Sequence, residues 1–174
     1  MEYMFMPLKR YAEFSGRSRR MEYWMWTLFQ ILLYAAVLVV SLVLVGGAAV
    51  SGDPSSAIAA GGVGLVVMGL YLLAQIAFFI PSLAVGVRRL HDTGRTGWWL
   101  LAPLAPYLLM FFGIGMAAST PDAAVAGGVV GMIGIVAVFA LAITLLVFLL
   151  LDGTPGHNKY GPDPKGRGDA GIFA

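Results

Sequence analysis

The sequence predicts an all-α membrane protein: four transmembrane helices, a short N-terminal interfacial helix, and both termini in the cytoplasm. Three observations support this fold class. The 174-residue chain is 59% hydrophobic and only 11% charged, which excludes an ordinary soluble domain. Four apolar runs are each long enough to cross a bilayer. All eleven Lys and Arg residues lie outside these runs, on one side of them.

The length and composition also bound the domain organisation and the partners. Four spans use about half of the chain, which leaves no room for a large soluble domain. We therefore expect a single integral membrane domain at 1–164 and a disordered tail at 165–174. The sequence has no cysteine, which excludes disulfides and thiol catalysis. A net charge of +2 is too small to indicate nucleic acid as a partner.

The N-terminal part of the chain contains a predicted surface helix and the first span. Leu8, Tyr11 and Ala12 share one helical face, which predicts a short interfacial helix at 7–14. The first apolar run is longer than the roughly 7–15 residues of a secretory signal core, so we interpret it as a span. The turn-forming stretch 46–54 follows it. The four spans are expected at 24–45, 62–85, 98–115 and 127–151.

Several residues inside the spans have expected structural roles. Pro81, Pro103 and Pro106 each remove a backbone donor, so each should kink its helix or mark a break. Gln30 and Gln75 favour an interhelical hydrogen bond, with a substrate site as the alternative. A stripe of small residues in the fourth span favours internal packing, with homodimerisation as the alternative; it consists of Gly127, Gly131 and Gly134.

The distribution of charge predicts the orientation in the membrane. Basic residues precede the first span, separate the second from the third, and follow the fourth. The two opposite loops, 46–61 and 116–126, carry no Lys or Arg and contain only Asp53 and Asp122 as charged residues. Because cytoplasmic loops carry the excess of Lys and Arg, both termini are expected in the cytoplasm.

Three cytoplasmic segments carry motifs at span boundaries. They are Gly16-Arg17-Ser18-Arg19-Arg20 with Glu22-Tyr23-Trp24, Arg88-Arg89-Leu90-His91-Asp92-Thr93-Gly94-Arg95 with Gly97-Trp98-Trp99, and Gly156 with Asn158-Lys159-Tyr160-Gly161-Pro162. In this order the motifs resemble those of domain-of-unknown-function family 805, small bacterial inner-membrane proteins, over almost the whole chain. The resemblance implies a multi-pass protein of the bacterial inner membrane and implies no activity.

Two carboxylates in these segments need cationic partners. Asp92 and Asp152 each fall near the cytoplasmic C-terminus of a predicted helix, where the macrodipole disfavours an anion. We therefore predict a polar cap in which the three segments converge through Arg–carboxylate pairs. The candidate cap or anion-binding residues are Arg17, Arg19, Arg20, Glu22, Arg88, Arg89, His91, Asp92, Arg95, Asp152, Asn158, Lys159 and Tyr160.

The cap permits two functional hypotheses. The first is a scaffold or lipid-associated accessory protein, in which the cap locks helix ends and the partners are membrane lipids, anionic ones above all. The alternative is binding or processing of a phosphorylated lipid or small anionic ligand at the cytoplasmic face. A second copy of the chain or another membrane protein is left open as a partner.

Enzymatic and transport functions have less support in the sequence. The spans contain no Asp, Glu, Lys, Arg or His, which disfavours an ion-coupled carrier. A divalent-metal site would have to use both histidines, His91 and His157, together with Asp92 and Asp152. We predict no catalytic residues, no metal site and no cofactor, and we do not expect an enzyme.

Overall fold

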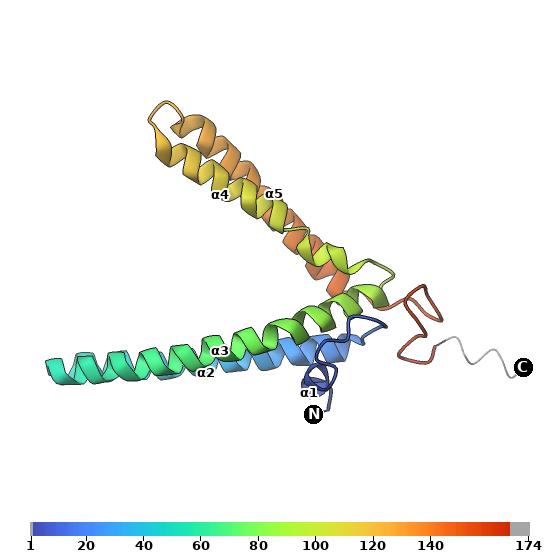
Figure 1. Ribbon diagram of the computed structural model, residues 1–174, viewed down its shortest axis with the longest axis horizontal. Coiled ribbons are helices and arrows are strands. Elements are labelled where there is room, and N and C mark those ends of the chain that lie inside the picture. Colours follow the sequence, from blue (N-terminus) through green and yellow to red (C-terminus); the bar gives the residue numbers. More distant parts are fainter. Residues whose placement is uncertain (1, 168–174) are drawn as a thin grey trace, which may run out of the picture. The chain divides into compact units, whose positions relative to one another are not determined.

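A computed structural model of the protein describes residues 2–167, and the regular elements in this range are helices (Figure 1). Four helical segments are long and apolar enough to cross a membrane: α2, α3, η1 with α4, and α5. The predicted all-α class and the four spans are therefore confirmed. The elements are α1 (Glu2–Lys9), α2 (Arg20–Ser51), α3 (Pro54–Asp92), the 3₁₀ helix η1 (Gly97–Leu101), α4 (Leu104–Ser119) and α5 (Ala124–Leu150).

The chain forms two compact units, which we describe separately. One comprises Met1–Glu13 with Met21–Val85, and the other comprises Phe14–Arg20 with Gly86–Ala174. The first unit holds α1, α2 and most of α3. The second holds the end of α3, α4, α5 and the C-terminal segment. The predicted single domain at 1–164 stays a prediction.

The turn between α2 and α3 is much shorter than expected. The prediction of a turn-forming stretch at 46–54 is wrong, because α2 continues through Gly46 and Gly47 to Ser51. The turn reduces to Gly52, which has a left-handed φ of 64°, and Asp53. The Asp53 carboxylate accepts the N–H of Ser55 at 3.0 Å, so it caps the start of α3. Pro54 occupies the first helical position, where its missing N–H has no cost.

Polar and aromatic side chains join α2 and α3, which run side by side in Figure 1. Gln75 donates to Gln30 at 3.3 Å, and Gln30 donates to the hydroxyl of Ser82 at 3.2 Å. The predicted interhelical hydrogen bond is thus confirmed. The Trp26 indole also donates to Ser82 at 2.9 Å, and its ring packs edge-on against Phe78. Lipid offers no competing partners to these groups, so they hold the two helices together.

The proline in α3 is compensated by the N-terminal segment. Pro81 has no N–H, so the carbonyl four residues before it, that of Ala77, loses its helical donor. The Tyr11 hydroxyl donates to this carbonyl at 2.6 Å. A ring contact between Phe5 and Phe29 also joins α1 to α2. Tyr11 therefore supplies the donor that the Ala77 carbonyl lacks within the helix.

The Tyr11 contact explains why the N-terminal helix differs from expectation. A helix was predicted at 7–14, whereas α1 spans Glu2–Lys9 and residues 10–12 form a turn. The helix prediction is wrong beyond Lys9, because the turn that follows brings Tyr11 to α3. The interfacial position of α1 stays a prediction.

We expect Tyr11→Phe to destabilise the protein by about 1–2 kcal/mol, because it leaves the Ala77 carbonyl unsatisfied. In a Pro81→Ala background the new backbone N–H can satisfy the same carbonyl, so Tyr11→Phe should cost much less. Reversible unfolding in mixed micelles measures all four corners of this double-mutant cycle. An equal cost in both backgrounds would show that the hydroxyl acts in another way.

The third span is broken where prolines predicted it. η1 ends at Leu101 and α4 begins at Leu104, with Pro103 at the N-cap. Pro106 falls in the first turn of α4, where an N–H has no intrahelical partner to lose. The predicted break is therefore confirmed at Pro103.

Glycines allow α4 and α5 to pack backbone against backbone. The two helices run side by side in Figure 1, and all three residues of the predicted stripe are buried. A Cβ added at Gly127 would lie 2.3 Å from the Ala117 nitrogen, and one at Gly134 would lie 2.5 Å from the Met110 nitrogen. The stripe is an internal packing face, as predicted.

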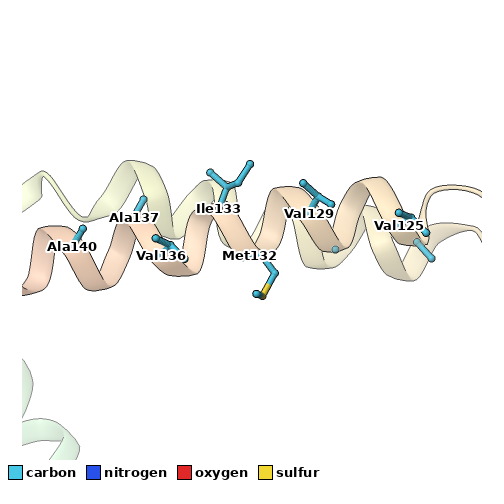
Figure 2. A pocket seen from close by; sticks show the side chains of 9 residues that line it. Val125, Val129, Met132, Ile133, Val136, Ala137 and Ala140 are labelled. Atoms are coloured by element: carbon cyan, nitrogen blue, oxygen red, sulfur yellow. The ribbon is translucent and has the colours of Figure 1, made fainter.

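Another face of α5 carries an apolar groove with a volume of about 650 Å³ (Figure 2). Apart from Met132, its lining consists of small and branched side chains such as Val125, Val129, Ile133 and Ala137. A second apolar hollow, of about 420 Å³, lies between α2 and α3 near the turn. Neither lining includes a charged side chain, so the candidate site must be sought among the polar segments.

Candidate functional site

Two glycine turns in the second unit bring the segments of the site together. α3 ends in a Schellman motif: the Gly94 N–H binds the His91 carbonyl at 3.0 Å and the Arg95 N–H binds the Leu90 carbonyl at 2.9 Å. Gly94 has the left-handed φ of 75° that this motif requires. Gly16, with φ of 81°, turns the 14–20 segment back onto α3, where the Ser18 N–H binds the Arg88 carbonyl at 3.1 Å. These turns place Arg17 beside the last turn of α3.

A buried carboxylate with two guanidinium partners forms the centre of the site. Arg17 Nε donates to Asp92 Oδ1 at 2.9 Å, and Arg89 Nη1 donates to Asp92 Oδ2 at 2.5 Å. All three side chains are at most 2% exposed. The two cations offset the unfavourable position of Asp92 at a helix C-terminus. We call Arg17, Arg89 and Asp92 the buried triad.

The cap arginines use their remaining donors on backbone carbonyls. Arg17 donates to the carbonyls of Thr154 at 2.5 Å and Gly156 at 2.7 Å. Arg89 donates to the carbonyl of Leu149 at 3.1 Å and to that of Leu151, so it caps the end of α5. The same pattern continues with Arg20 to Leu150, Arg19 to Pro164 and Arg167 to Gly153.

The C-terminal segment needs these donors because its backbone forms almost no regular structure. Residues 151–167 contain turns, bends and one isolated bridge, between Asn158 and Gly161. Its carbonyls would otherwise depend on water alone. The arginines therefore hold this segment against the ends of α3 and α5.

The Asn158-Lys159-Tyr160-Gly161 motif docks on the last turn of α3. Asn158 donates from its side chain to the His91 carbonyl at 3.0 Å and to the Thr154 hydroxyl at 3.0 Å. The Tyr160 ring stacks on the His91 imidazole, with 3.8 Å between centroids and 5° between planes. His91 Nδ1 lies 3.2 Å from the Gly16 carbonyl. His91 thus touches both neighbouring segments of the cap.

Asp152 lies on the exposed side of the cap with three cations around it. Lys165 donates to it, Arg167 Nη1 lies 2.9 Å away, and Arg20 Nη2 lies 3.7 Å away. The hydrogen bond from Lys165 lowers the pKa of Asp152 from 3.8 to about 2; partial burial opposes this, and the Gly153 N–H and the two arginines support it. The ionised form therefore stabilises the cap above about pH 4, and this contribution is lost as the pH falls towards 2.

Asp163 is a buried carboxylate that the sequence interpretation missed. Burial raises its pKa, but hydrogen bonds from Arg167 Nε and the Lys165 N–H, together with the charges of Arg167 and Arg17, outweigh that effect and lower the pKa overall. Thr154, Lys165 and Arg167 were missed as well. Their segment was assigned by composition to the Gly- and Pro-rich end of the chain, although the alternation of Asp163, Lys165 and Arg167 was a signal of local ion pairs.

The structure brings nine of the thirteen predicted residues into this network: Arg17, Arg19, Arg20, Arg89, His91, Asp92, Asp152, Asn158 and Tyr160. Arg88 is fully buried in α3, and its carbonyl takes the Ser18 N–H. Arg95 lies over the Phe148 ring at 3.8 Å, and exposed Lys159 lies 4.9 Å from the Tyr160 ring. Glu22 lies in α2, 3.9 Å from Arg10.

The predicted disordered tail includes two residues that make ion pairs. It was placed at 165–174, but Lys165 and Arg167 bind Asp152 and Asp163. Residues 168–174 lie outside the described residues. Between residues 2 and 167, no three His, Asp or Glu side chains gather as a metal-ligand group, so the alternative built on His91 and His157 is not assembled.

Comparison with known proteins gives one family. The family model described as "Protein of unknown function (DUF805)" matches residues 11–162. The inner membrane protein YhaI of Escherichia coli K12 is 33% identical over 165 residues, covering 95% of this chain and 97% of the relative. The inner membrane protein YhaH is 32% identical, covering 95% and 98%, and the uncharacterized protein YiiR is 27% identical, covering 87% and 86%. No solved structure matches the chain.

Proposed function

The chain belongs to the DUF805 family, and from this membership and the geometry of the cap we propose that it is a lipid-associated scaffold of the inner membrane with both termini cytoplasmic. In this proposal the cap holds the helix ends and the C-terminal segment in place. The protein then acts through the surfaces it presents to lipids and to membrane partners.

One observation carries the proposal: the central arginines of the cap are engaged by the chain itself. Arg17 and Arg89 share the carboxylate of Asp92 and also bind four carbonyls of the 149–156 stretch. Guanidinium groups frequently recognise a phosphate through two parallel donors. Those of Arg17 and Arg89 are buried and directed inward, which supports a structural role at the centre of the cap.

The exposed apolar surface supports the association with lipid. The groove along α5 lies on a helix without charged residues, and Figure 2 shows its aliphatic lining. Such a surface fits acyl chains and apolar helix faces better than a polar substrate. The charge distribution supports the orientation, because the excess of Lys and Arg falls at the two termini and between the second and third spans.

Single-cysteine labelling tests the orientation, and the cysteine-free sequence makes it straightforward. We expect a membrane-impermeant maleimide to label Ser55→Cys and Ser119→Cys in intact spheroplasts. Ser15→Cys and Lys159→Cys should be labelled only after the membrane is opened. The reverse pattern would overturn the orientation.

Native mass spectrometry of the wild-type protein in mild detergent tests the scaffold itself. We expect retained phospholipids and no other bound small molecule. A phosphorylated metabolite that co-purifies in stoichiometric amount would replace the scaffold proposal with ligand binding or processing. This readout needs no variant, so it cannot be confused with misfolding.

A further inference from the structure

The cation cluster around Asp152 differs from the rest of the cap in its exposure. The side chains of Arg20, Lys165 and Arg167 are 44%, 29% and 35% exposed, and that of Asp152 is 43% exposed. Arg17 and Arg89 are at most 1% exposed. An anion from outside can therefore reach the cluster, whereas it cannot reach the buried triad.

Among residues 2–167, the cluster also carries an excess of positive charge. Three cations of this range face the carboxylate of Asp152. Arg167 has a second partner in Asp163 at 2.8 Å, but that carboxylate also lies 3.8 Å from Arg17. The three side chains come from two distant segments and converge within 4 Å of one carboxylate. Such a convergence holds the donors of an anion site in position before the anion arrives.

The place of the cluster in the fold indicates what kind of anion it meets. Arg20 donates to the carbonyl of Leu150, the last residue of α5. Leu150 and Leu151, beside the cluster, are both exposed. A long apolar helix ends here and charged side chains begin, which is the arrangement expected at the boundary between hydrocarbon and headgroups. A phospholipid has both the acyl chain and the phosphate that such a boundary accommodates.

We propose that Arg20 and Lys165 bind the phosphate of an anionic phospholipid at the end of α5, beside Arg167, with Asp152 holding the three cations together. This site makes the proposed lipid association specific. Its location on the cytoplasmic face of the membrane rests on the orientation in the proposed function. Asp152 has a second effect. Its charge repels the phosphate, so it limits the affinity of the site that it organises.

Titration of detergent-purified protein with phosphatidylglycerol, followed by native mass spectrometry, tests the site. Arg20→Gln combined with Lys165→Gln should weaken binding roughly 30-fold. Lys9→Gln combined with Arg10→Gln removes two cations that are not part of the cluster and should leave binding unchanged.

Each remaining outcome would overturn the site. Equal losses in the two double variants would mean that binding follows total charge alone. Equal affinity for phosphatidylcholine would remove the charge selectivity, and displacement by millimolar inorganic phosphate would assign the cluster to a soluble anion. Lipid binding in detergent does not depend on the orientation of the protein in the membrane. A failed lipid titration therefore overturns the site, whereas a reversed cysteine-labelling pattern overturns the proposed orientation.

Discussion

Asp92→Ala is expected to destabilise the protein by about 3–5 kcal/mol, the cost of leaving buried charges without their partner. Arg17 and Arg89 both lose a carboxylate while remaining buried. The 151–167 segment should loosen at the same time, because these arginines also hold its carbonyls. Reversible unfolding in mixed micelles measures the first effect, and hydrogen exchange of the segment measures the second.

Glu13→Ala is the matched control for this substitution. Glu13 pairs with Arg10 at the same i,i+3 spacing that separates Arg89 from Asp92, but its side chain is 44% exposed. An exposed pair contributes only about 0–1 kcal/mol, so this variant should remain close to wild type. If both variants lower the free energy of unfolding equally, burial of the triad has no energetic consequence and the cap does not stabilise the helix ends as we describe.

Gly113→Ala is expected to disrupt the α4–α5 hairpin, whereas Gly131→Ala is expected to be tolerated. A Cβ at Gly113 would lie 2.2 Å from the nitrogen of Gly131 and 2.8 Å from the carbonyl oxygen of Gly127. Both contacts are to backbone, so only separation of the helices can relieve them. Overpacking of this kind costs about 1–3 kcal/mol or more. A Cβ at Gly131 meets nothing closer than 3.7 Å, an ordinary contact.

The two alanine variants thus distinguish the effect of close backbone contact from the effect of adding a methyl group. They add the same methyl group to glycines that face each other in one interface. Thermal unfolding in detergent should show a clear loss for Gly113→Ala and no loss for Gly131→Ala. Equal behaviour would mean that the helices do not approach as closely as the glycines allow.

The sequence alone predicted the four spans and showed that two carboxylates need cationic partners. Apolar length and charge asymmetry are properties of contiguous segments, so they can be read without knowing the path of the chain. The helix macrodipole acts in the same local way. It identified Asp92 and Asp152 as carboxylates that need cations, and both have them in the structure.

Only the folded structure shows which cations pair with these carboxylates. Asp92 meets Arg17 across 75 residues of sequence because Gly16 and Gly94 turn two segments towards each other. Composition indicated disorder at Lys165 and Arg167, since it could not show that Asp152 and Asp163 would hold them. The hydrogen bond from Tyr11 to the Ala77 carbonyl could not be predicted from the sequence for the same reason. A contact between distant residues depends on how turns direct the chain, and no local pattern contains that information.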